Sequence, residues 1–198
     1  MEAADGPSQP PTAAAAAAAD AALAEAEGET VDAEIQEIKD LYTELASNPD
    51  KNYGWGTGKE NARHLGYPAE LLESFPAEVW ESNAAGGYPF SLGDISPGDT
   101  VVDIGTGAGA DVCVAAHLVG PTGKVIGVDI TPAMVEKTRA NAAACGFAAR
   151  VTVVEQCFEF PRLIGGTRQG REWPTIIPRD SVDVVVSNNV INLMAAKL

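Results

Sequence analysis

The sequence predicts an α/β fold in which a parallel sheet carries helices on both faces. Three observations support this class, all from the second half of the chain. Short β-branched runs recur there, helical segments separate them, and a glycine-rich loop directly follows the first run. At 198 residues the chain has room for one such domain and an extension.

Four strands and two helices are expected in this region. A strand at 100–104 leads into the glycine loop, and an apolar segment at 112–119 forms a buried helix. A second helix begins at Thr131 as N-cap, with Pro132 in the first helical position, and ends near Gly146. The segment from 160 to 180 is long for a connection, which indicates a surface insertion. The other expected strands are 124–130, 150–154 and 181–187.

The first half divides into a tail and a cap. Residues 1–30 consist mainly of Ala, Pro and acids, a composition typical of a disordered tail. Residues 31–92 form a helical cap: an amphipathic helix starts at Val31 and stops before Pro49, and a short helix follows near 68–74. The sheet domain is then expected over residues 93–198.

Composition excludes several functions. The net charge of −15 repels phosphate backbones, so nucleic acid is not expected as a partner. No apolar run reaches the ~18 residues of a membrane span, and the N-terminus does not resemble a signal peptide. Three cysteines without close spacing predict neither a disulfide framework nor a metal site, which suits a reducing, cytoplasmic setting.

The glycine loop marks a candidate ligand site. It runs from Gly105 to Ala110, and a strand, glycine turn and helix in this order present backbone N–H groups to a nucleotide-like ligand. The loop also satisfies the looser dinucleotide pattern, so a nicotinamide-dependent oxidoreductase is one alternative. A purely structural role in helix packing is another.

Two acids and the position of the loop favour S-adenosylmethionine over these alternatives. Asp103 lies two residues before the first glycine, where a buried carboxylate suits a cationic ligand group and repels a pyrophosphate. Asp129 follows the second strand, where a carboxylate can accept both hydroxyls of a ribose. The loop also comes about 100 residues into the chain, after a cap, whereas dinucleotide folds often begin with it.

Longer motifs resemble one family. VVDIGTGAGAD, HLVGPTGKVIGVDITPAMVEKTRANA and SVDVVVSNNVINL are similar to segments of the arsenite methyltransferases, and the likeness extends from about residue 53 to 198. The resemblance implies a Rossmann-like class I methyltransferase sheet, with Asp103 and the glycines on the methionine end of the cofactor, Asp129 on the ribose, and Ile130 and Met134 beside the adenine. The full set of implied cofactor residues is Asp103, Ile104, Gly105, Thr106, Gly107, Asp129, Ile130, Met134, Gln156, Cys157, Phe158 and Asn188.

The sequence departs from this family at the acceptor. Trivalent arsenic needs thiolate ligands. The family has cysteines in its N-terminal region, where this sequence has none, and at two further positions, which are here occupied by Gly86 and Asn189. Cys113 and Cys145 are expected as small buried hydrophobes. Asn189 suits a polar small-molecule acceptor instead, aligned beside the methyl group. No catalytic base is evident, with His64 as a weak candidate.

The C-terminal half of the implied sheet is missing. Class I methyltransferases order seven strands 3-2-1-4-5-7-6, and this sequence stops after the fourth. We therefore expect a C-terminally incomplete domain, either a fragment or a chain completed by a partner. A non-catalytic cofactor-binding module is the alternative function. The sequence does not indicate which oligomeric state the chain adopts.

Overall fold

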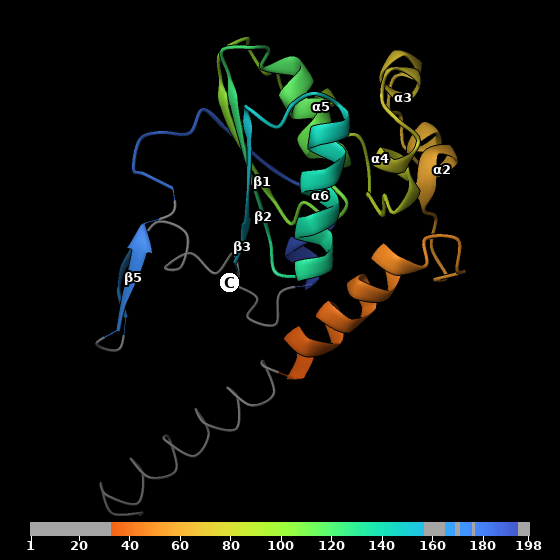
Figure 1. Cartoon of the computed structure of the whole chain (residues 1–198), viewed down its shortest axis with the longest axis horizontal. Coiled ribbons are helices and arrows are strands. Elements are labelled where there is room, and N and C mark those ends of the chain that lie inside the picture. Colours follow the sequence, from red (N-terminus) through yellow and green to blue (C-terminus); the bar gives the residue numbers. More distant parts are fainter. Residues whose placement is uncertain (1–32, 157–164, 169–170, 176, 194–198) are drawn as a thin grey trace, which may run out of the picture.

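Four parallel strands form the central sheet of the computed structural model, which describes residues 33–156, 165–168, 171–175 and 177–193. The strands are β1 (Thr100–Ile104), β2 (Lys124–Asp129), β3 (Val151–Glu155) and β6 (Val184–Ser187). Their order is β3-β2-β1-β6, with β1 paired to both β2 and β6 (Figure 1). Both the predicted fold class and the predicted order of the first four strands are confirmed.

Helices α5 (Ala110–Leu118) and α6 (Pro132–Ala144) lie side by side against the sheet (Figure 1). α5 packs on the strand face that carries Val101 and Val125. The opposite face carries Val102 and Val128, which pack with Ile177. Burial on both faces explains why these strands read as near-continuous apolar runs and not as alternating ones.

Helix α6 begins and ends where the sequence predicts. Thr131 is the N-cap residue and Pro132 the first helical residue, although the Thr131 side chain makes no capping hydrogen bond. Gly146 follows the C-cap residue with a φ of +75°, a left-handed conformation that favours glycine and ends the helix.

The segment predicted as a surface insertion contains regular structure. Strands β4 (Gly165–Arg168) and β5 (Arg171–Thr175) pair antiparallel in a separate two-stranded sheet. The hairpin within the expected surface insertion was not predicted. The glycines and the proline in this segment lower its β propensity, which hid the hairpin from sequence patterns.

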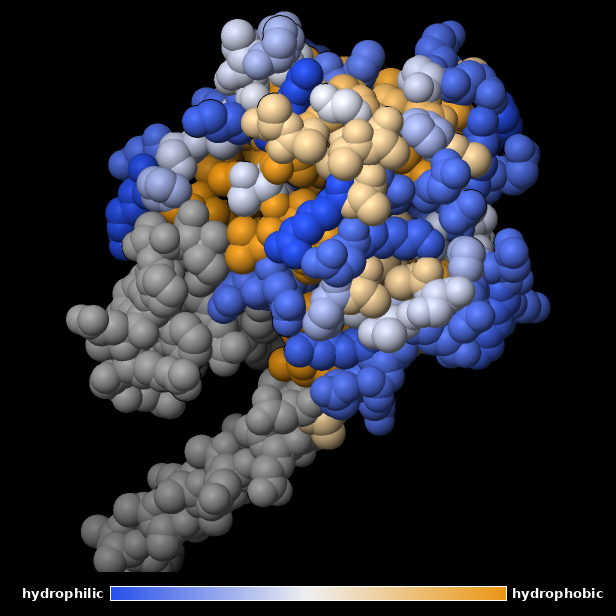
Figure 2. All heavy atoms as spheres, viewed as in Figure 1, coloured by the Kyte–Doolittle hydropathy of each residue, from blue (hydrophilic) through white to orange (hydrophobic). Residues whose placement is uncertain are grey.

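The cap consists of short helices. A helix at residues 33–47, called here the N-terminal helix, precedes α2 (Gly58–His64), α3 (Ala69–Ser74) and α4 (Glu78–Glu81), and a 3-10 turn at Pro89–Ser91 leads to β1. α2 and α4 were not predicted. Figure 2 shows mainly hydrophilic residues over the cap side of this view and hydrophobic residues nearer the sheet.

The cap and the sheet domain share one core. Leu72 and Trp80 of the cap are fully buried and pack in one cluster with Cys113 and Val114 of α5. The aromatic ring of Tyr67 joins this cluster, 5.5 Å from the Trp80 ring in an edge-on arrangement. The cap is thus fixed to α5 by apolar burial.

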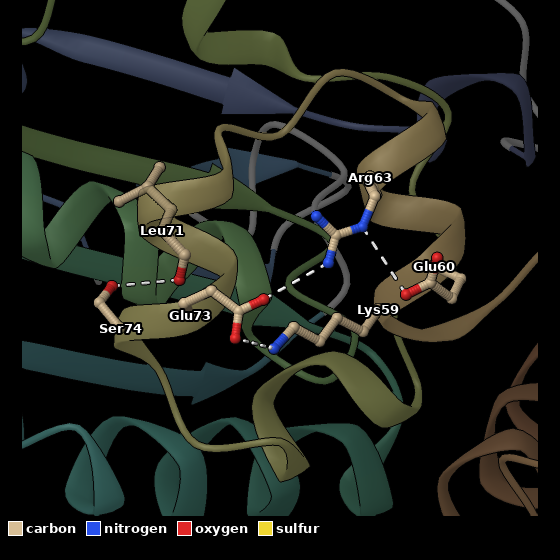
Figure 3. A network of polar contacts seen from close by, with 6 residues as sticks. All are labelled: Lys59, Glu60, Arg63, Leu71, Glu73 and Ser74. Atoms are coloured by element: carbon tan, nitrogen blue, oxygen red, sulfur yellow. Dashed lines mark hydrogen bonds and ion pairs between the residues drawn. The ribbon is translucent and has the colours of Figure 1, made fainter.

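An exposed ion-pair network ties α2 to α3 (Figure 3). Glu73 accepts hydrogen bonds from Lys59 Nζ at 3.0 Å and from Arg63 Nη2 at 3.4 Å. The Lys59 ammonium, and then Arg63, lower the pKa of Glu73. Exposed pairs of this kind contribute about 0–1 kcal/mol each, so the network sets the relative placement of the two helices more than their stability.

Two expectations about the chain as a whole concern its N-terminus and the membrane. The predicted disordered tail at 1–30 lies outside the described residues. Within the described part of the chain, every helix is too short or too polar to cross a bilayer.

Candidate functional site

Two glycines of the loop after β1 have different surroundings: Gly105 is tightly packed and Gly107 is not. A Cβ at Gly105 would lie 2.2 Å from Cγ2 of Val190, so this glycine permits the turn after β6 to pack directly on the loop. Gly107 has a φ of +51°, and a Cβ built there would meet no atom within 4 Å. The space beside the Cα of Gly107 is therefore open, which lets a ligand approach the loop closely there.

Two side chains of α6 hydrogen-bond carbonyl groups of the glycine loop. Oγ1 of Thr138 donates to the carbonyl of Gly107 at 2.7 Å, and Nδ2 of Asn141 donates to the carbonyl of Ala108 at 2.8 Å. Both side chains are buried. The sequence analysis missed these two residues, because polar groups on a helix give no local sign that they face a loop about 30 positions earlier.

Three buried carboxylates surround the loop: Asp103 at 2% exposure, Asp111 at 7% and Asp129 at 7%. The carboxylate of Asp129 accepts from the backbone N–H of Gly107 and of Thr131, at 2.8 Å each. Asp129 therefore joins the end of β2 to the loop after β1, and the predicted importance of this acid has a geometric basis.

Asp111, in the first turn of α5, anchors the cap to the end of β6. Its carboxylate accepts from the hydroxyl of Tyr67 and from Nδ2 of Asn188, at 2.8 Å each. Nδ2 of Asn188 also donates to the carbonyl of Gly87 at 2.9 Å. Burial raises the pKa of Asp111, while its Asn188 and Tyr67 donors act in the opposite direction. One signal could have revealed Asp111: it is an acid directly before the apolar segment that was predicted as a buried helix.

Asp103 differs from these two acids. No donor among the described residues hydrogen-bonds its carboxylate, and burial, followed by the charges of Asp111 and Asp129, raises its pKa well above the ordinary value. A buried carboxylate without a donor is unfavourable unless a cation or donor reaches it. The site thus favours a positively charged ligand group at the end of β1.

The two predicted acceptor residues lie next to each other. A Cβ at Gly86 would be 3.4 Å from Cβ of Asn189, and the backbone N–H of Gly86 donates to Oδ1 of Asn188 at 3.0 Å. Asn189 has a φ of +58° and donates from Nδ2 to the carbonyl of Ala84 at 3.3 Å. The cap and the end of β6 therefore form one polar wall, called here the Gly86–Asn189 wall.

Residues 95–198, just over half of the chain, match the family described as methyltransferase domain. The chain belongs to this methyltransferase domain family. The predicted assignment to the methyltransferases is thereby confirmed at the level of the domain family.

Curated relatives of this methyltransferase domain include arsenite methyltransferases. One from Halobacterium salinarum is 38% identical over 141 residues, which is 71% of this chain and 32% of that protein. A protein-L-isoaspartate O-methyltransferase from Ignicoccus hospitalis is 28% identical over 128 residues, 65% of this chain and 55% of that protein. The chain thus spans about a third and about half of these relatives. The predicted resemblance to arsenite methyltransferases is confirmed.

Among solved structures, an arsenic(III) S-adenosylmethionine methyltransferase from Chlamydomonas reinhardtii shares 29% identity with the methyltransferase domain. It covers 68% of this chain, the chain covers 40% of it, and the TM-score is 0.42.

The remaining predicted cofactor residues of the methyltransferase domain lie around the same strand ends. Ile104 and Ile130 are half-buried at the ends of β1 and β2, and Thr106 is buried against Gly127. The backbone N–H of Gln156 donates to the carbonyl of Asp129 at 2.9 Å. Met134 is fully buried in the first turn of α6. Two further predicted residues lie outside the described part of the chain: Cys157 and Phe158.

The described cysteines of the methyltransferase domain belong to its core. Cys113 is fully buried and Cys145 partly buried, in one cluster with Phe147, and neither contributes to the Gly86–Asn189 wall. Contact with Cys145, followed by burial, raises the pKa of the Cys113 thiol. His64 is exposed on α2, with Nδ1 2.7 Å from the carbonyl oxygen of Glu60. This position gives His64 no access to the acidic residues of the site.

Proposed function

We propose that this chain binds S-adenosylmethionine at the glycine loop and transfers its methyl group to a polar small-molecule acceptor at the Gly86–Asn189 wall. The observation that carries the proposal is Asp103, a buried carboxylate with no donor among the described residues at the carboxyl end of a parallel strand. We further propose residues 31–92 as the cap and 93–198 as the cofactor-binding domain.

The chain's residues fit the cofactor at both ends. Asp103 is available to the ammonium of the methionine part, and a cation there would relieve the charge of the three neighbouring acids. Each oxygen of Asp129 accepts one backbone N–H, which leaves a lone pair on each for a ribose hydroxyl. When bound, the cofactor supplies an electrophilic methyl group on a sulfonium.

The chemistry of the wall argues against arsenite as the acceptor. A trivalent arsenic centre needs soft thiolate ligands. The wall presents amides and backbone groups, and the two cysteines of the described residues lie in the core cluster. Asn189, whose amide makes one hydrogen bond among the described residues, instead offers hydrogen bonds to an oxygen or nitrogen nucleophile. The residues of the chain would accelerate transfer by alignment, which is worth several kcal/mol in well-oriented systems.

Calorimetric titration of S-adenosylhomocysteine into the purified chain tests this proposal, with NADH as the control ligand. We expect micromolar affinity for the first and none for the second. Asp103→Asn should weaken binding at least tenfold, because it removes the charge opposite the ammonium. The matched change Asp94→Asn, at an exposed position before β1, should leave affinity unchanged.

Other outcomes assign the chain differently. Affinity for NADH alone would overturn the proposal in favour of an oxidoreductase. Binding of S-adenosylhomocysteine without turnover of any oxygen, nitrogen or thiol acceptor would support a non-catalytic cofactor-binding module. The cytoplasmic location and the exclusion of nucleic acid stay predictions from composition.

A further inference from the structure

The end of the N-terminal helix packs on the residues that would hold the cofactor. Leu45 of this helix is fully buried and forms one cluster with Ala108 of the glycine loop and Met134 of α6. Tyr42, one turn earlier on the same helix face, packs against this cluster and is half-buried. In Figure 1 the helix (orange) passes below the lower end of α6, and its C-terminal end points toward α2.

A lysine of α6 holds this end of the helix in place. Nζ of Lys137 donates to the carbonyl of Ala46 at 3.0 Å and to Oγ of Ser82 at 2.7 Å, and the Ser82 hydroxyl donates to the carbonyl of Leu45 at 3.2 Å. The last carbonyls of a helix have no partners within it and favour a nearby cation. Lys137 therefore ties the N-terminal helix to the same α6 that supports the glycine loop.

The phenol of Tyr42 lies within electrostatic reach of Asp129, the acid that the proposed function assigns to the ribose. Burial raises the pKa of Tyr42, and the carboxylate of Asp129 raises it further, which places the two groups within electrostatic range. Among the described residues, the Tyr42 hydroxyl has no hydrogen-bond partner. The hydroxyl can therefore donate a hydrogen bond to a ligand or accept one from it.

We propose that the last two turns of the N-terminal helix form the outer wall of the cofactor site, with Tyr42 hydrogen-bonding the cofactor's ribose opposite Asp129 and Lys137 locking the helix in place. This inference rests on the proposed function. The rest of the helix is largely exposed, so these contacts decide whether it stays docked. A bound cofactor adds one more contact to the docked state and stabilises it by mass action.

Binding measurements with three variants test the role of Tyr42. Tyr42→Phe keeps the ring that packs against the cluster of Leu45, Ala108 and Met134 but removes the hydroxyl. We expect its Kd for S-adenosylhomocysteine to rise about threefold to tenfold, the effect of one hydrogen bond. Lys137→Met, which keeps the aliphatic stem, should raise Kd by a similar factor. Glu37→Ala, on an exposed position of the same helix, should leave Kd within twofold of wild type.

The result that overturns this inference differs from the one that overturns the proposed function. If wild type fails to bind S-adenosylhomocysteine, the cofactor assignment is wrong. If wild type binds and Tyr42→Phe binds equally well, the cofactor assignment stands and the role of Tyr42 is refuted.

Hydrogen exchange tests the docking of the helix independently of affinity. Amides at 42–47 should exchange more slowly when S-adenosylhomocysteine is present, and faster in Lys137→Met than in wild type without ligand. Equal exchange with and without ligand in wild type would show that the helix is not part of the site.

Discussion

Replacing Asp103 by asparagine should stabilise the chain in the absence of cofactor while it impairs binding. The wild-type carboxylate is 2% exposed, has no donor among the described residues and faces the charges of Asp111 and Asp129. A carboxyl whose pKa rises by one pH unit on folding costs about 1.4 kcal/mol of stability once it is ionised. We therefore expect Asp103→Asn to raise the free energy of unfolding by about 1–3 kcal/mol at pH 8.

The pH dependence distinguishes this cause from others. Because folding raises the pKa of Asp103, the folded state holds its proton longer, and wild-type stability falls as pH rises from the ordinary Asp value of about 3.9 through the folded-state pKa. Asp103→Asn lacks this loss, so its advantage should shrink as the pH falls from 8 toward the ordinary Asp value of about 3.9. Urea unfolding across this range, with Asp94→Asn as control, measures both quantities. A variant that is less stable than wild type at pH 8, or an advantage independent of pH, would refute the reasoning.

Three further changes probe the site. Tyr67→Phe removes a donor to Asp111 and should lower the free energy of unfolding, measured by urea denaturation, by about 2 kcal/mol. Tyr88→Phe, which changes a half-buried neighbouring ring, should lower it far less. Equal losses in the two variants would contradict the role of the Tyr67 hydroxyl. Thr138→Val leaves the carbonyl of Gly107 without its donor and should cost about 1–3 kcal/mol in the same assay; a neutral effect would show that the bond does not hold the loop. The double change Gly86→Cys with Asn189→Cys sets two thiols at a Cβ separation near the ~3.8 Å typical of paired cysteines. It should create affinity for phenylarsine oxide that neither single variant has, measured by calorimetry; an unchanged affinity would show that the wall does not bring the two positions together.

The sequence predicted the sheet and the outline of the site because their signals are local. β-branched runs gave the strands to within a few residues, and the glycine loop and the strand-end acids stand at fixed places relative to those runs. The contact between Asp129 and the glycine loop has the same local basis, since an acid at the end of the second strand lies beside the loop after the first.

The supporting contacts were not predictable, because they join ordinary residues far apart in the chain. Tyr67 meets Asp111 across 44 positions and Asn188 across 121. A tyrosine after a short helix and an asparagine after a strand carry no periodic signal, and their contacts depend on how the cap packs on α5. The packing of Tyr42 against the cluster that contains Ala108 was unpredictable for the same reason. It results from tertiary packing of the N-terminal helix and not from helix propensity.

The contact between Gly105 and Val190 makes assembly of the site depend on the order of folding. β1 has β2 on one side and must wait for β6, which is synthesised last of the four strands, on the other. Until then the loop lacks the side chain that packs on Gly105, and one edge of β1 offers unpaired backbone groups to other chains. Such non-local parallel pairing is slow to form. A nascent chain that ends before Val190 would therefore hold most of the sheet but no finished glycine loop, and ligand affinity would appear only when β6 has joined.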